Sequence, residues 1–437
     1  MDPKSDDGHA SITVNLLNGH EKHHADAVFH PQVSGKTSFS KTCFNGINAL
    51  SGVGILSVPY ALASGGWLSL MYLLIIAATT YYTGLLIQRC MDLDSNIRSY
   101  PDIGERAFGS AGRTVVSILM NMELYMVATG FLILEGDNLE NIFPDFKVRL
   151  AGIVVAGKVS FVILVGLIVL PTVLLNNMSV LSYISASGVI ASVTLLGSMV
   201  WASATDGIGT HSSDILLSWK GTPTAVSLYA FCYCAHPVFP TLYTSMENPR
   251  QFSKVLLVCF LVCTISYASM AILGYLMFGS EVLSQVTLNL PFGKLSSKVA
   301  IFTTLINPIA KYALMVKPLV NATENMLASH CSKKSHSLLV RISLVISTVI
   351  VALAIPLFGY LMSLVGACFS IAASVLLPCL CFLKISGIYR RLKLEMFIIS
   401  TIVVMGVVIM VVGTYTSLQE IIGHFLKIRD RCQHCDQ

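Results

Sequence analysis

Two ionisable side chains lie near the centres of long apolar stretches of the sequence. Glu123 falls within residues 114–139 and Lys311 within residues 299–325. Ionisable groups that deep in a membrane pair with each other or line a water-filled path. If the two side chains pair, they form a permanent ion pair between helices. If they line a water-filled path, Lys311 is a built-in cation where other membrane proteins hold Na⁺, and Glu123 accepts a proton as the protein works.

A glycine-rich segment interrupts the first apolar stretch. Ser51, Gly52, Val53, Gly54 and Ile55 follow one another there, and glycine removes the side-chain barrier to non-helical backbone. An unwound turn frees amide and carbonyl groups that a small zwitterion can bond. We expect a second half-helix to begin near Gly54 and to present its amides to a carboxylate. The alternative is that these small residues serve close packing between helices.

Two prolines interrupt the sixth apolar stretch. Pro237 and Pro240 lack the amide hydrogen that continues a helix, so each frees a carbonyl group upstream. The candidate carbonyls for a ligand's ammonium group run from Cys232 through Ala235 to His236. Corresponding breaks in two halves of a multi-span chain indicate a transporter binding site at the membrane midplane.

Other polar residues near these breaks each allow two interpretations. The imidazole of His236 either titrates near physiological pH or stays neutral, fixed by a backbone hydrogen bond. Tyr125 follows the central carboxylate of its span by two residues, so one of the two faces a cavity and the other faces packing. Glu135, Asp137 and Glu140 either form an acidic vestibule at the end of the third stretch or cap the helix in water.

The composition identifies a polytopic membrane protein. Of the 437 residues, 54% are hydrophobic and 12% are charged, against about 25% charged in an average soluble domain. Apolar stretches long enough to cross a bilayer lie at 42–63, 67–90, 114–139, 159–175, 178–202, 223–246, 253–278, 299–325, 338–359, 361–383 and 395–418. We therefore predict an all-α integral membrane fold with eleven transmembrane helices.

The order of the stretches predicts two inverted repeats of five spans plus one extra helix, with the first span of each repeat interrupted. Lysine and arginine are more frequent on the side that carries the N-terminus, which places that end in the cytosol. We divide the chain into a disordered cytosolic tail (1–37), a membrane domain (38–418) and a short C-terminal tail (419–437).

Several function classes are excluded or disfavoured. The net charge of +5 is scattered over loops, so nucleic acid is not an expected partner. Cys432-Gln433-His434-Cys435 lacks a second ligand pair, so no metal site is predicted. The sequence has no Walker loop and no nucleophile elbow in a suitable context, which argues against an enzyme and against a bound cofactor. Active transport then depends on an ion gradient.

Ordered motifs over nearly all of residues 38–418 give the chain a family resemblance. They are the run from Asn45 to Tyr60, Tyr100-Pro101-Asp102-Ile103-Gly104, Ala107-Phe108-Gly109, Met122-Glu123-Leu124-Tyr125, Leu134 to Leu139, Leu170-Pro171-Thr172, Leu181 to Ala186, His236 to Pro240, Asn307-Pro308 and Lys311 to Leu314. With these motifs the chain resembles plant vacuolar amino acid transporters of the amino acid/auxin permease family.

The resemblance implies a fold like that of the bacterial leucine transporter and proton-coupled movement of mainly neutral amino acids across the vacuolar membrane. It implies that the broken spans hold the substrate's carboxylate and amine, with Tyr125 and Asn307 from the third and eighth spans completing the pocket. The chain departs from its relatives at Cys234-Ala235, where they commonly carry Ser-Gly. The added methyl group narrows the site or stiffens the break.

We therefore predict a secondary active transporter that works by alternating access, with its proton coupling on Glu123 or Lys311. The alternative is an amino acid-sensing receptor that uses the same pocket with little flux. The expected partners are a small amino acid and the lipid bilayer. The sequence assigns no oligomeric state, and the plasma membrane or another endomembrane is the alternative location.

Overall fold

Helices make up nearly all of the described part of the chain. The structure, a computed structural model, describes residues 37–150, 153–155, 157–174, 178–205, 215–291, 293–327, 333–355, 357–387 and 393–435. The predicted N-terminal tail (1–37) lies outside these residues except for Thr37. The predicted C-terminal boundary at residue 418 falls within a helix, α14 (Lys393–Cys435).

The first and sixth spans are broken where the glycines and prolines predicted. The first consists of α1 (Phe39–Leu50), a 3-10 turn η1 (Val53–Leu56) and α2 (Val58–Gly65). The sixth consists of α7 (Thr222–Cys232), η2 (His236–Val238) and α8 (Phe239–Ser245). The second half of the first span thus begins at Val58 and not near Gly54, because η1 occupies the intervening residues.

The remaining spans are longer helices. They are α3 (Ser69–Leu93), α4 (Tyr100–Ile142), α5 (Gly157–Leu174), α6 (Met178–Thr205), α9 (Phe252–Phe278), α10 (Leu295–Leu327) and α11 (Lys333–Ala354). The tenth span combines α12 (Phe358–Val365), π-helical turns at Gly366–Ser370 (η6) and Ala372–Leu376 (η7), and α13 (Leu377–Ser386). Nine helices in the described ranges are long and apolar enough to span a membrane. The two broken spans, whose helices are shorter, are not among these nine.

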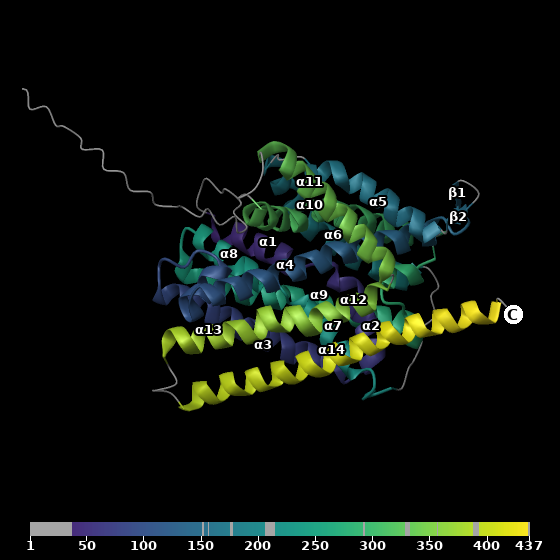
Figure 1. Cartoon of the computed structure of the whole chain (residues 1–437). Coiled ribbons are helices and arrows are strands. Elements are labelled where there is room, and N and C mark those ends of the chain that lie inside the picture. Colours follow the sequence, from purple (N-terminus) through teal and green to yellow (C-terminus); the bar gives the residue numbers. More distant parts are fainter. Residues whose placement is uncertain are drawn as a thin grey trace, which may run out of the picture.

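Small elements mark the two ends of the helix bundle. A short antiparallel hairpin, β1 (Val148–Leu150) with β2 (Ile153–Val155), lies at the opposite end from the start of α1 (Figure 1). We call these ends the hairpin face and the N-terminal face. The sequence did not predict the hairpin. The 3-10 turns η4 (Gly279–Glu281) and η5 (Val286–Asn289) connect α9 to α10, and η3 (Pro249–Gln251) precedes α9.

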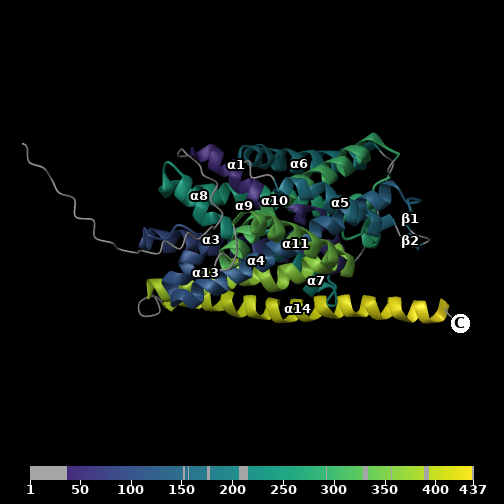
Figure 2. The same cartoon turned by 45° about the horizontal axis from the view of Figure 1, so that its top comes forward.

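The last helix lies at the edge of the bundle. Figure 2 shows α14 along one side, with its C-terminal end projecting past the other helices. In the most apolar stretch of α14, 17% of the residues are buried, against 72% in the corresponding stretch of the tenth span. The tenth span therefore lies inside the bundle, whereas α14 presents most of its surface outward.

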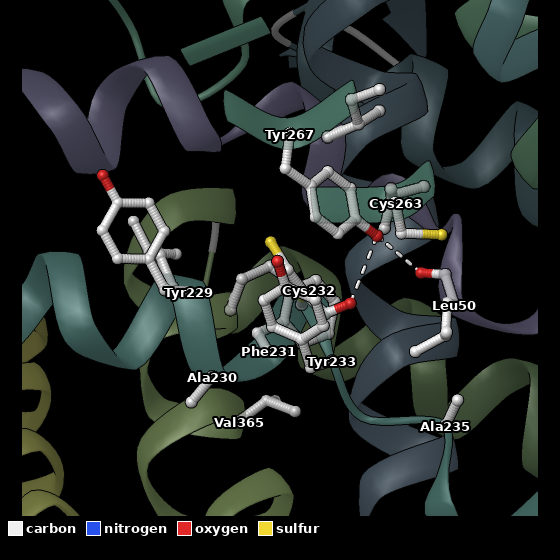
Figure 3. Packing of buried hydrophobic residues seen from close by; sticks show 14 of the residues in the cluster. Leu50, Tyr229, Ala230, Phe231, Cys232, Tyr233, Ala235, Cys263, Tyr267 and Val365 are labelled. Atoms are coloured by element: carbon white, nitrogen blue, oxygen red, sulfur yellow. Dashed lines mark hydrogen bonds between the residues drawn. The ribbon is translucent and has the colours of Figure 1, made fainter. Parts of the chain in front are cut away.

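A tyrosine hydroxyl joins the two breaks. The single hydroxyl hydrogen of Tyr267, on α9, is shared between two carbonyl oxygens; the hydroxyl oxygen lies 2.6 Å from that of Leu50 and 3.2 Å from that of Cys232 (Figure 3). Leu50 ends α1 and Cys232 ends α7, so both carbonyls lose their helical partners at the breaks. The Leu50 oxygen also accepts from the amide of Gly52 at 2.8 Å. An unpaired backbone group inside a membrane protein is costly, so Tyr267 stabilises the meeting point of the two broken spans.

Replacing Tyr267 by phenylalanine is expected to destabilise the fold. The substitution leaves the buried Cys232 carbonyl without its donor, which costs about 1–3 kcal/mol. We expect a lower midpoint of thermal unfolding in detergent. Tyr125→Phe is the matched control, because its hydroxyl donates only to the Ser347 hydroxyl at 3.1 Å and leaves no carbonyl unpaired. Equal unfolding midpoints for the two variants would show that the Tyr267 hydroxyl stabilises the fold no more than the Tyr125 hydroxyl does.

Candidate functional site

A small cavity lies beside the break of the first span. It lies between η1, α6 and α10 and is partly open, with a volume of about 20 Å³, which is room for about one water molecule. Its lining residues are Gly52, Val53, Ile55, Leu56, Ala191, Ser192, Leu195, Thr303, Thr304, Asn307 and Pro308. Four of these, Gly52, Val53, Ile55 and Asn307, were predicted as substrate-binding residues. Leu56 of η1 and residues of the fifth and eighth spans supply the rest of the lining.

The cavity has an apolar wall and a few polar groups. Leu56, Ala191 and Leu195 provide aliphatic surface, and the hydroxyl of Ser192 lies among them. The side-chain oxygen of Asn307 is buried and has no hydrogen-bond partner among the described residues. Binding sites for small molecules typically combine such an apolar lining with a few placed polar groups. An unpaired amide oxygen in the wall is therefore a ready acceptor for a ligand N–H group.

Ser51 connects the break to the fifth span without lining the cavity. Its hydroxyl donates to Oγ of Ser192 at 2.5 Å, and the Ser192 hydroxyl donates to the carbonyl oxygen of Gly188 at 3.1 Å. Ser51 thus fixes the position of Ser192 in the cavity wall. The backbone carbonyl of Ser51 has a separate partner in the eighth span.

That partner is Lys311, which lies one helical turn beyond Asn307 along α10. Its side chain is buried, and Nζ donates to the Ser51 carbonyl oxygen at 3.4 Å. Gly188 makes room for it, because a Cβ atom there would lie 2.8 Å from Nζ and would also meet Asn48 Oδ1. The ammonium group therefore lies at the unwound end of α1, where helix-end carbonyls favour a cation.

Glu123 lies at a different place, against the sixth and tenth spans. Its carboxyl oxygen accepts from the Ser370 hydroxyl at 2.6 Å, and the Cys234 thiol is also a hydrogen-bond partner. Among the described residues, no ion pair joins Glu123 to Lys311. The structure therefore does not contain the permanent ion pair between Glu123 and Lys311 that was the alternative interpretation. Cys234, at which this chain differs from its relatives, is thus in direct contact with the carboxyl group of Glu123, the candidate for proton coupling.

His236 faces the second and tenth spans and not the cavity. The fully buried ring places Nε2 at 3.0 Å from the Thr80 carbonyl oxygen and 2.9 Å from Thr83 Oγ1. A carbonyl oxygen only accepts, so Nε2 carries the hydrogen. The hydroxyl of Thr83 in turn donates to the Ser374 carbonyl oxygen at 2.6 Å. This arrangement matches the second interpretation of His236, a ring fixed by backbone hydrogen bonds.

Three further predicted residues also lie away from the cavity in this structure. The hydroxyl of Tyr125 donates to Ser347 of α11, so Tyr125 faces packing and Glu123 the polar interior. The carbonyl of Cys232, predicted as a partner for an ammonium group, already accepts from Tyr267. Ala235 is buried beside the second break and does not line the cavity.

The two glycines of the first break have different surroundings. A Cβ atom on Gly54 would lie 2.8 Å from the Cys232 sulfur and 3.3 Å from the Cys232 Cα. A Cβ atom on Gly52 would meet only the Leu50 carbonyl oxygen, at 4.0 Å. Gly54 thus serves the close packing that was the alternative interpretation. Gly52 borders open space in the cavity, as the binding interpretation requires.

Several site residues were not predicted from the sequence. Ser192, Thr303 and Thr304 line the cavity, Ser370 contacts Glu123, and Tyr267 joins the breaks. Thr303 and Thr304 precede Asn307 by four and three residues, which places them on its side of a helix. That spacing was a usable signal. Ser192, Ser370 and Tyr267 stand among many similar residues in apolar stretches, so only the tertiary structure distinguishes them.

Comparison with known proteins gives consistent matches over most of the chain. Residues 35–419 match the family described as transmembrane amino acid transporter protein. The chain is 57% identical to amino acid transporter AVT1I of Arabidopsis thaliana, over 89% of this chain and 96% of that protein. It is 58% identical to amino acid transporter AVT1J of the same plant, over 91% and 94% of the two chains.

Two solved structures have a similar fold. A Na⁺-coupled sialic acid symporter gives a TM-score of 0.54 at 12% identity, covering 90% of this chain and 92% of that one. A manganese transporter of Eremococcus coleocola gives a TM-score of 0.50 at 13% identity, covering 89% of each chain. These likenesses concern the fold alone, and they confirm the predicted leucine-transporter-like, all-α class.

Alanine at the two glycines should separate binding from packing. Gly52→Ala adds a methyl group toward the cavity without a steric clash, so the protein should fold and bind its ligand at least tenfold more weakly, or about 1.4 kcal/mol. Gly54→Ala forces the two breaks apart and should lower the thermal unfolding midpoint. Ligand titration and unfolding of both purified variants measure these effects. Unchanged affinity in Gly52→Ala would place the ligand outside this cavity.

Proposed function

Because the chain belongs to the family of transmembrane amino acid transporter proteins, we propose that it moves amino acids across a membrane as a secondary active transporter. The observation that carries this proposal is the cavity at the broken first span, with an unpaired Asn307 oxygen in its wall and Lys311 at the end of α1. The cycle is alternating access, in which the broken spans move against the other helices.

The cavity suggests how a zwitterion binds. The amides of Val53 and Gly54 begin the η1 turn, and neither has a carbonyl acceptor among the described backbone hydrogen bonds. We propose that they bind the carboxylate, and that the Asn307 oxygen accepts from the ammonium group. This replaces the expectation that carbonyls from Cys232 to His236 bind the amine, since Tyr267 already donates to the Cys232 oxygen.

The aliphatic wall supports a preference for neutral amino acids. Leu56, Ala191 and Leu195 offer apolar contact to a substrate side chain, and no acidic or basic residue lines the cavity. A charged side chain would lose its water there without gaining a partner, which is costly. The lining therefore favours substrates with neutral side chains.

We propose proton coupling with two buried groups. Lys311 lies next to the cavity and, when protonated, supplies a positive charge where a sodium-coupled protein binds its ion. Glu123 contacts Cys234 of the second break and Ser370 of the tenth span, so a change in its protonation alters contacts that the moving sixth span makes. Both groups are buried, so a change of charge in either has a large effect on the stability of one conformation.

We propose the vacuolar membrane as the location, with the N-terminus in the cytosol. The support is the resemblance to plant vacuolar transporters together with the distribution of lysine and arginine in the sequence. A fluorescent fusion compared with vacuolar and plasma-membrane markers tests the location. A signal at the plasma membrane or another endomembrane would overturn it.

Uptake into proteoliposomes tests the proposed function. Purified full-length protein is supplied with labelled neutral amino acids under a pH gradient, a sodium gradient or no gradient. We expect accumulation with the pH gradient alone. Accumulation with sodium alone would overturn the proton coupling. Binding without accumulation under any gradient would favour the receptor alternative.

Glu123→Gln should uncouple transport from protons. The variant cannot lose or gain a proton at this position, so uptake driven by the pH gradient should fall at least tenfold, while exchange of internal for external amino acid continues. The same proteoliposomes measure both rates. Glu281→Gln is the control, because Glu281 is exposed in a connection between spans and should leave both rates unchanged. Retention of gradient-driven uptake in Glu123→Gln would remove Glu123 from the coupling.

A further inference from the structure

A short connection between the seventh and eighth spans is partly buried at the hairpin face. We call residues 279–290 the η5 segment, and its residues Gln285, Val286 and Thr287 are fully buried. Connections usually run over the protein surface, because buried loop backbone is hard to satisfy with hydrogen bonds. The buried part of the η5 segment instead packs between α4 and α10.

Side chains near the end of α4 hold the η5 segment in place. Nε2 of Gln285 donates to Asp137 Oδ2 at 2.8 Å, and Nδ2 of Asn138 donates to Gln285 Oε1 at 3.3 Å. Oγ1 of Thr287 donates to Asn138 Oδ1 at 3.3 Å. Lys158 at the start of α5 forms an ion pair with Oδ1 of Asp137. These bonds attach the η5 segment to α4 and, through Asp137, to α5.

Glu135 lies on α4 next to the residues that bind the η5 segment. It precedes Asn138 by three residues, so the two side chains are neighbours on the same side of α4. The Glu135 side chain is 1% exposed, and neither of its carboxyl oxygens has a hydrogen-bond partner in the part of the chain that is described. The sequence placed this residue in an acidic vestibule or in water, but its carboxyl group is buried. An ionised carboxylate is costly there, since it has lost water and gained no donor.

We propose that Glu135 is a proton-binding site that controls the η5 segment, separate from Glu123 and Lys311. When Glu135 is protonated, the η5 segment stays buried and the hairpin face is closed. When Glu135 releases its proton, the carboxylate needs water, and the η5 segment leaves α4 and opens this face. The inference rests on the proposed transport, because opening of this face is one half of alternating access.

The other charged groups nearby have partners or contact water. On the elements packed around this end of α4, these groups are Asp137, Glu140, Lys158, Glu281 and Lys298. Asp137 pairs with Lys158, and Glu140 accepts from the Lys158 amide at 3.3 Å. Glu281 is exposed to solvent, and Lys298 is half-buried and is not without an interaction partner. Glu135 differs from these groups because its carboxyl group is buried and has no hydrogen-bond partner among the described residues.

Hydrogen–deuterium exchange of the purified full-length protein tests the proposal. Exchange is followed on peptides covering residues 279–290 from about pH 5 to about pH 8, and is corrected for the intrinsic pH dependence of amide exchange. We expect protection of the η5 segment to fall by up to about tenfold per pH unit as the pH rises, because opening releases one proton. Glu135→Gln is neutral at every pH and should keep the high protection found at low pH.

Two further variants make the test specific. Glu281→Gln changes an exposed carboxyl group of the same segment and should follow the parent protein at every pH. Glu135→Met is also neutral and of similar size, and it replaces Glu135→Gln if that variant does not fold. Protection that is independent of pH in the parent protein would overturn the proposal, as would parental pH dependence in the neutral variants.

The outcome is distinguishable from a failure of the proposed function. Exchange is measured without substrate or gradient, whereas transport is measured separately as flux into proteoliposomes. Protein that shows the pH-dependent opening but no flux would overturn the transport proposal and leave the proton site at Glu135 standing.

Discussion

The hydrogen bonds of one tyrosine hydroxyl hold together the part of the molecule on which everything else depends. A broken helix inside a membrane leaves carbonyl groups that water cannot reach, so the protein itself must supply their partners. Tyr267 does this for Leu50 and Cys232 together. The two breaks must therefore lie close to each other and to α9, and the close approach of Gly54 to Cys232 completes the junction.

This junction determines where the open space lies. Because Gly54 and the Cys232 carbonyl are used in packing, the second break contributes little to the cavity, which forms on the other side of η1 against α6 and α10. The cavity thus has residues of η1 and Gly52 on one wall, the Asn307 amide on another and Lys311 nearby. Glu123 lies on the far side of the junction, in contact with Cys234 and Ser370. The two candidate coupling groups are separated by the broken spans rather than paired.

The sequence predicted the features that depend on single residue types. Glycines and prolines located both breaks, and the depth of Lys311 along its span placed it beside the first break. It could not predict which way each small residue faces, because Gly52 and Gly54 differ only in their tertiary neighbours. Nor could it distinguish Tyr267 from the other tyrosines of apolar spans. His236 and Glu135 each had two alternatives in the sequence, and only burial and hydrogen-bond partners distinguish them.

The central claim is that substrate binds in the cavity beside the first break. An experimental structure of the full-length protein with a bound neutral amino acid tests it most directly. The account predicts ligand density between η1, α6 and α10, with the carboxylate at the amides of Val53 and Gly54 and the amine at Asn307. Density beside Tyr125 or His236, with the cavity between η1, α6 and α10 unoccupied, would contradict it.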